Sequence, residues 1–88
     1  MAEAAQRTRV EVRVELKPGI FDAEADSVFR SLERLGVAGV RGVSTARLYT
    51  LEFEAADPAE ATRTAQKAVD RLLANPVIHR VTVAAARG

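Results

Sequence analysis

The 88-residue sequence contains no cysteine and no tryptophan, and only three phenylalanines and one tyrosine. The absence of cysteine excludes disulfide bonds and fits a reducing, cytoplasmic setting. Because aromatic side chains are so few, the core must be built from aliphatic residues and alanine. A core of this size supplies only about 3–5 kcal/mol, so subunit association is the expected additional source of stability. We therefore expect a homodimer or a higher oligomer.

The chain also lacks an excess of charge of either sign and any long apolar run. Its 13 basic and 12 acidic residues give a net charge of +1, which does not favour nucleic acid as a partner. No apolar run approaches the ~20 residues that span a bilayer, so no membrane association is expected. The composition predicts one folded domain over residues 9–85, preceded by a flexible segment at 1–8 and followed by a tail at 86–88.

The first half of the sequence predicts a strand followed by a helix. From Arg9 to Leu16, apolar and charged residues alternate strictly, as in a half-buried strand that Lys17-Pro18-Gly19 then ends. Asp22 is a suitable cap for the helix that follows, and Gly36 is a suitable stop. The expected apolar face of this helix comprises Ala25, Val28, Phe29, Leu32 and Leu35.

The middle of the sequence predicts further strand structure. Tyr49, Leu51 and Phe53 alternate with polar residues as far as Glu54, which is typical of a strand with one buried face. The pattern leaves open whether Val40 to Ala46 forms a separate short strand or part of one long bent strand. We favour two pieces, although no tight-turn dipeptide separates them.

The second half predicts another capped helix and a last strand. Asp57-Pro58-Ala59-Glu60 combines an N-cap, a proline at the first helical position and a following acid. The expected apolar stripe of this helix comprises Ala61, Ala65, Ala68, Val69, Leu72 and Leu73. Asn75-Pro76 ends the helix, and a strand from Val77 to Ala84 follows.

These elements predict an α+β fold. We expect a two-layer sandwich in which two helices cover one face of an antiparallel sheet, in the order βα(β)βαβ. This order is ferredoxin-like in outline.

Side chains that could carry chemistry are sparse, and we predict no catalytic, cofactor-binding or metal-binding residue. His79 has no orienting group in the pattern and is expected to be a partly exposed residue at a strand edge. Glu24 and Asp26 suit the first turn of a helix better than a metal site. The glycines within residues 36–42 precede a strand instead of opening a helix, so we interpret them as loop glycines. The function is therefore expected to lie in surfaces that meet partners.

Three segments carry a resemblance to a known family: Lys17-Pro-Gly-Ile-Phe-Asp22, Leu32-Glu-Arg-Leu-Gly36 and Leu72-Leu-Ala-Asn-Pro-Val-Ile78. Together they resemble PurS, the small subunit of bacterial and archaeal phosphoribosylformylglycinamidine synthase. The resemblance extends from about Val10 to Val83. The chain has Ala46-Arg47 where the family usually has Gly-Lys, which keeps the positive charge but loses the glycine.

The resemblance implies a non-catalytic subunit of an ATP-consuming, glutamine-dependent ligase of purine biosynthesis. Such a subunit joins the glutaminase subunit (PurQ) to the synthetase subunit (PurL) and supports the transfer of ammonia between them. ATP and Mg²⁺ would be used by the synthetase subunit, with no cofactor bound by this chain. The candidate partner contacts are Lys17, Arg47 and Asn75, chosen for their expected exposure and position.

An alternative interpretation is an ACT-like regulatory domain that binds a small molecule. The turn Lys17-Pro18-Gly19-Ile20 between the first strand and the first helix resembles the ligand-binding turn of that family. The lysine at position 17 counts against this alternative, because an acidic residue is expected before that turn.

Overall fold

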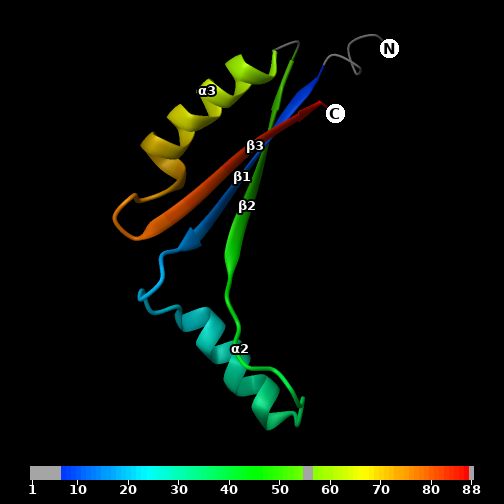
Figure 1. Ribbon diagram of the computed structural model, residues 1–88, viewed down its shortest axis with the longest axis vertical. Helices are drawn as coiled ribbons and strands as arrows, with labels where there is room; N and C mark the ends of the chain where they lie inside the picture. The colour runs from blue at the N-terminus through cyan, green and yellow to red at the C-terminus, as the bar shows by residue number, and fades with distance from the viewer. Residues whose placement is uncertain (1–6, 55–56, 88) are drawn as a thin grey trace.

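The computed structural model describes residues 7–54 and 57–87 (Figure 1). Three strands form one antiparallel sheet in the order β2-β1-β3. The α+β class, the antiparallel sheet and the two α-helices are confirmed. The elements in chain order are β1 (Thr8–Leu16), α2 (Ala23–Arg34), β2 (Ala46–Phe53), α3 (Pro58–Ala68), the π-helical turn η1 (Val69–Leu73) and β3 (His79–Arg87).

The central strand β1 explains why the sheet has one apolar and one charged face. Val10, Val12 and Val14 are buried on the inner face, as their alternation predicts. The charged residues between them lie on the outer face, where ion pairs cross between strands. Arg9 contacts Glu52 of β2 at 3.5 Å. The outer face is thus a polar surface of alternating charge.

Helix α3 covers the inner face of the sheet. The Asp57 carboxylate caps it by accepting hydrogen bonds from the backbone N–H groups of Ala59 and Glu60 at 2.8 and 3.1 Å. Ala61 and Ala65 are buried against the valines of β1, because small side chains let the helix approach the strands closely. The helix packs over β1 and β3. The side chains of β2 on this face are therefore only half-buried; they are Tyr49, Leu51 and Phe53.

Helix α2 does not join α3 on the sheet, in contrast to the expected layer of two helices. It lies beyond the end of the sheet, at the bottom of Figure 1, and none of its described residues belongs to the core cluster. The turn after Leu16, with Gly19 at a φ of 90°, directs the chain away from the sheet before the helix begins. The radius of gyration is 17.1 Å, against about 12 Å for a compact chain of this length.

Residues 40–45 form no strand, although the sequence favoured a separate one there. The pairing of β1 with β2 ends at Glu15 opposite Ala46. Residues 40–45 lie past that point, where β1 has already left the sheet, so they have no strand to pair with. Instead, Arg41 and Val43 line a cavity beside Phe29 of α2. The order of regular elements is therefore βαβαβ.

The end of the second helical segment differs from the sequence expectation at Leu72, whereas Leu73 packs against the core as expected. The chain widens into the π-helical turn η1, in which the backbone N–H of Ala74 bonds to the carbonyl of Val69 at 3.2 Å. This bond spans five residues, one more than in an α-helix. The wider turn directs Leu73 toward the core and leaves Leu72 82% exposed, so Leu72 is not a core residue.

The strand limits also differ slightly from the expected ones. Strand β3 begins at His79, so Val77 lies in the preceding turn and is exposed, not on the strand face. Thr8, placed in the flexible segment by the sequence, is the first residue of β1 and is buried. Strand β3 reaches Arg87, into the expected tail. Residues 1–6 of the expected segment and Gly88 lie outside the described residues.

Candidate functional site

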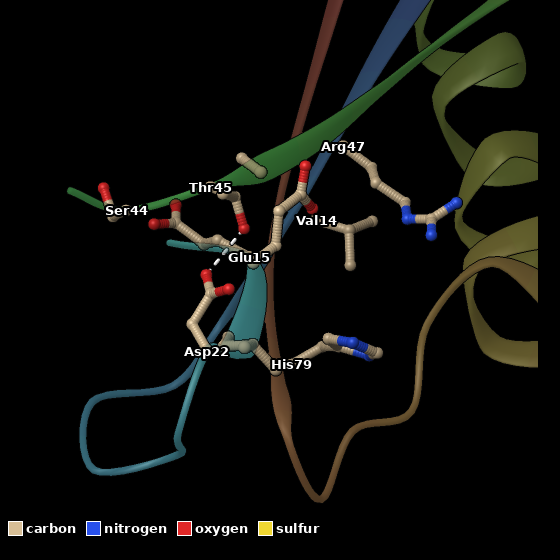
Figure 2. Close-up of a pocket in the computed structure, with 10 residues that line it drawn as sticks. Val14, Glu15, Asp22, Ser44, Thr45, Arg47 and His79 are labelled. Carbon is tan, nitrogen blue, oxygen red and sulfur yellow. Dashed lines mark hydrogen bonds between the residues drawn. The ribbon is translucent and has the colours of Figure 1, made fainter. Parts of the chain in front are cut away.

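The candidate site is the end of the sheet where β1 stops and both β2 and β3 begin. A cavity of about 560 Å³ opens there, lined mainly by polar side chains (Figure 2). The lining comes from the end of β1, the start of α2 and the first residues of β2 and β3. It comprises Val14, Glu15, Leu16, Asp22, Glu24, Ser44, Thr45, Ala46, Arg47 and His79.

Asp22 connects the start of α2 to the start of β2 at this end. One carboxylate oxygen accepts from the backbone N–H of Ala25 at 2.9 Å and caps the helix. The other accepts from the Thr45 hydroxyl at 2.6 Å, the bond drawn in Figure 2. The Thr45 hydrogen bond, followed by the Ala25 N–H, lowers the pKa of Asp22 below its ordinary value. Asp22 therefore helps to fix the direction in which α2 leaves the sheet.

Glu15 faces the outer side of the same sheet end. Arg80 donates to its carboxylate at 3.2 Å, and Arg13 lies 3.5 Å from it. The hydrogen bond from Arg80 is the main cause that lowers the pKa of Glu15. The Glu15 charge is thus balanced by two arginines of this chain.

Replacing Thr45 by valine is expected to raise the pKa of Asp22 toward its ordinary value. The lowered pKa of the folded state stabilises the fold above the ordinary value of 3.8, and this contribution is lost as the pH falls through the folded pKa. Thr45→Val should therefore lower stability at pH 7. Its effect should become progressively smaller as the pH falls below the ordinary pKa of 3.8. Titration of the carboxyl carbon by NMR, with unfolding measured at several pH values, tests this expectation.

The matched control is Thr50→Val, which changes an exposed threonine on β2. Asp22 should titrate at the same pH in this variant as in the wild type. An unchanged Asp22 titration in Thr45→Val would show that the 2.6 Å hydrogen bond does not hold the pKa down.

His79 is held in one orientation by the turn before β3. Its Nδ1 accepts from the backbone N–H of Asn75 at 2.9 Å, so in the neutral ring the proton is on Nε2. The ring is half-buried, in agreement with the partly exposed side chain expected from the sequence, and His79 is the first residue of β3. Figure 2 shows the His79 ring and the Arg47 guanidinium on the same side of the cavity.

The structure places the three predicted contact residues at this one end of the sheet. Lys17 is exposed directly after β1, and Arg47 is exposed near the start of β2. Asn75 is exposed before β3, but its side-chain oxygen accepts from the Val77 N–H at 2.9 Å and so holds the turn. No hydrogen bond or ion pair joins these three side chains to one another within the described ranges. Their role as partner contacts stays a prediction.

The polar side chains of this cavity include a carboxylate in hydrogen-bond contact with a hydroxyl. The Thr45 hydroxyl could act as a nucleophile only if Asp22, to which it donates a hydrogen bond, accepted its proton. The lowered pKa of Asp22 makes this carboxylate a poor proton acceptor. Across residues 7–54 and 57–87, no three His, Cys, Asp or Glu side chains are grouped to hold a metal ion. Neither described helix has the length and apolar character needed to cross a bilayer.

Comparison with known protein families shows to which family this chain belongs. The model of the family described as "PurS: Phosphoribosylformylglycinamidine (FGAM) synthase" matches residues 9–87. The chain belongs to the PurS family. The subunit PurS of phosphoribosylformylglycinamidine synthase from Archaeoglobus fulgidus is 36% identical over 73 residues, which cover 83% of this chain and 91% of that protein.

Solved PurS structures share the fold. Methanocaldococcus jannaschii PurS, one of the subunits of formylglycinamide ribonucleotide amidotransferase, is 26% identical with a TM-score of 0.84, covering 92% of this chain and 98% of that chain. A chain of the PurLQS structure from Thermotoga maritima has a TM-score of 0.80 and covers 91% of this chain and 98% of that chain. Because its identity is 22%, this match shows likeness of fold alone.

Two features of this PurS chain were missed by the sequence reasoning. The first is Thr45, whose bond to Asp22 spans 23 residues and leaves no local signal. The second is the exposure of Leu72. It depends on the π-helical turn η1, because positions 65, 68, 69, 72 and 73 have the spacing of one α-helical apolar stripe and give no signal against Leu72.

Proposed function

We propose that this chain is the non-catalytic small subunit of phosphoribosylformylglycinamidine synthase in purine biosynthesis. The observation that carries the proposal is the match of the PurS family model over residues 9–87. The Archaeoglobus fulgidus relative is named as a subunit of this synthase, which supports the same place for this chain. A cytoplasmic location agrees with the absence of cysteine.

In this proposal, the chain bridges the glutaminase subunit PurQ and the synthetase subunit PurL and supports the transfer of ammonia. The resemblance in the sequence implies both partners. A bridging subunit holds two active sites in register and keeps ammonia away from water, where protonation would remove its nucleophilicity. ATP and Mg²⁺ serve the synthetase subunit. The exposed side chains of Lys17 and Arg47 are proposed contacts with these partners.

The chain acts in this assembly as a homodimer or a higher oligomer. Val28 of helix α2 is 41% exposed and Leu35 just after the helix is 76% exposed, so this part of the apolar stripe lacks a cover within one chain, whereas Ala25 of the same stripe is buried. The inner face of the sheet beside α3 has a matching uncovered part, formed by the half-buried Leu51 and its neighbours on β2. We place α2 of a second copy on this part of the sheet. The exchange is reciprocal, so both apolar surfaces are covered by one symmetric contact.

Reconstitution with the synthetase and glutaminase subunits of the same organism tests the bridging function. Omitting this chain should lower glutamine-dependent turnover at least ~10-fold, because the two active sites lose their relative position. Turnover with an ammonium salt in place of glutamine should fall much less, because free ammonia reaches the synthetase without transfer. Both rates are measured with the three proteins and with the two partners alone.

The two substrates make the test specific. Equal glutamine-dependent turnover with and without this chain would contradict the proposed function. An equal loss with glutamine and with ammonium would contradict the role in ammonia transfer, since the chain would then act on the synthetase itself.

A further inference from the structure

The turn before β3 is closed by two hydrogen bonds between Asn75 and His79. The carbonyl of Asn75 accepts from the backbone N–H of His79 at 2.8 Å, and the N–H of Asn75 donates to Nδ1 of the His79 ring at 2.9 Å. The Asn75 side chain also accepts from the Val77 N–H at 2.9 Å. The carbonyl of Ile78 accepts from the N–H of Lys17 at 2.9 Å and ties the turn to the end of β1. The His79 ring is therefore one of the groups that hold this turn on the sheet.

The bond to the His79 ring differs from the other bonds of the turn because its acceptor can take up a proton. Nδ1 accepts through the lone pair of the neutral imidazole, whereas both ring nitrogens of an imidazolium carry hydrogen and neither can accept. The N–H of Asn75 would then point at another N–H group. Protonation of His79 and this hydrogen bond therefore exclude each other. The other bonds of the turn have amide oxygens as acceptors, which do not titrate.

Charged side chains lie beside His79 in two cavities. The cavity at the sheet end is lined by His79 together with three carboxylates and one guanidinium, those of Glu15, Asp22, Glu24 and Arg47. A second cavity, of about 220 Å³ between α3, η1 and β3, is lined by His79 and by Asp70, whose carboxylate accepts from Gln66. Arg47 opposes a positive charge on the ring, and the carboxylates attract it. A protonated ring that leaves Asn75 therefore has carboxylates in both cavities as alternative partners.

We propose that the turn at residues 74–78 is a pH-sensitive switch, in which protonation of His79 releases the Asn75 N–H and loosens the turn at the end of β1. The bond is present when the imidazole is neutral and is lost as the pH falls. His79 is the one histidine of the sequence. Imidazole is the side chain that ordinarily titrates between about pH 5.5 and 7.5. The switch lies within one chain, so the inference does not depend on the proposed function.

An NMR titration of the full-length, ¹⁵N-labelled chain from pH 7.5 to 5.5 tests the switch directly. The backbone amide of Asn75 should change its chemical shift with the same midpoint as the ring nitrogens of His79. At pH 7.5 the ring nitrogens should show the proton on Nε2. The melting temperature, measured at a fixed protein concentration, should be about 4–8 °C lower at pH 5.5 than at pH 7.5, because one hydrogen bond of the turn is lost.

His79→Gln is the control, because its amide oxygen can accept a hydrogen bond but takes up no proton in this pH range. In this variant the Asn75 amide should keep its chemical shift, and the melting temperature should be the same at pH 5.5 and pH 7.5. A wild-type His79 ring that titrates without any change at the Asn75 amide would overturn the switch. A His79→Gln variant that keeps the wild-type pH dependence would overturn it as well. If the variant does not fold, the wild-type titration alone decides the outcome.

Discussion

Replacement of Ala65 by aspartate is expected to leave the chain unfolded at neutral pH. The Ala65 side chain is fully buried between α3 and the valines of β1. A carboxylate at this position would be buried without a partner, which costs several kcal/mol. A core of this size supplies only about 3–5 kcal/mol in total, so the substitution exceeds the available stability. Far-UV circular dichroism and urea titration measure the loss.

The chain offers a closely matched control for this prediction. Ala59 lies in the same helix and is exposed. Ala59→Asp adds the same charge to the first turn of α3, where the helix dipole favours a negative side chain. This variant should fold at least as stably as the wild type. A cooperative unfolding transition of Ala65→Asp near that of the wild type would contradict the close packing of α3 on the sheet.

The strands and the helix caps could be predicted because their signals are local. Alternation from Arg9 to Leu16 specifies one buried and one solvated face wherever the strand lies in the sheet. Asp22 and Asp57 cap helices through bonds to residues within three positions, so short sequence motifs contain the whole interaction. These parts of the fold were correct for physical reasons that the sequence contains.

The position of α2 could not be predicted in the same way. An amphipathic helix indicates that an apolar surface covers it, but not whether that surface belongs to the same chain. The sequence reasoning assigned the stripe containing Val28 to this chain's own sheet. The structure instead directs α2 past the sheet end through the turn at Gly19 and the long-range bond between Asp22 and Thr45.

The position of the candidate contact residues could be predicted in part, and their role as contacts stays a prediction. The expected contacts Lys17 and Arg47 lie at one end of the sheet, because strand ends and adjoining turns meet there. The role of Asn75 in holding the turn depends on its bond to the Val77 N–H, and the exposure of Leu72 depends on a π-helical turn. Neither feature follows from residue type or from α-helical spacing, since each depends on the backbone geometry of the turn.

Val28→Asp on α2 is expected to convert the proposed oligomer into monomers. The wild-type chain should associate because the α2 stripe and the uncovered part of the sheet cover each other across a symmetric contact. An aspartate within that contact would be desolvated without a partner and should raise the dissociation constant about 100-fold, equivalent to ~2.8 kcal/mol. Light scattering after size-exclusion chromatography, over a range of concentrations, measures the change.

Ser27→Asp is the matched control, because it adds the same charge one residue earlier, at an exposed position on α2. It should associate as the wild type does. The melting temperature gives an independent readout, because an oligomer that stabilises its subunits melts at a higher temperature as its concentration rises. Val28→Asp should lose this concentration dependence, and Ser27→Asp should keep it. A wild-type chain that is monomeric at all concentrations would show that α2 has a different partner, since its exposed apolar stripe would then be covered only within the synthase.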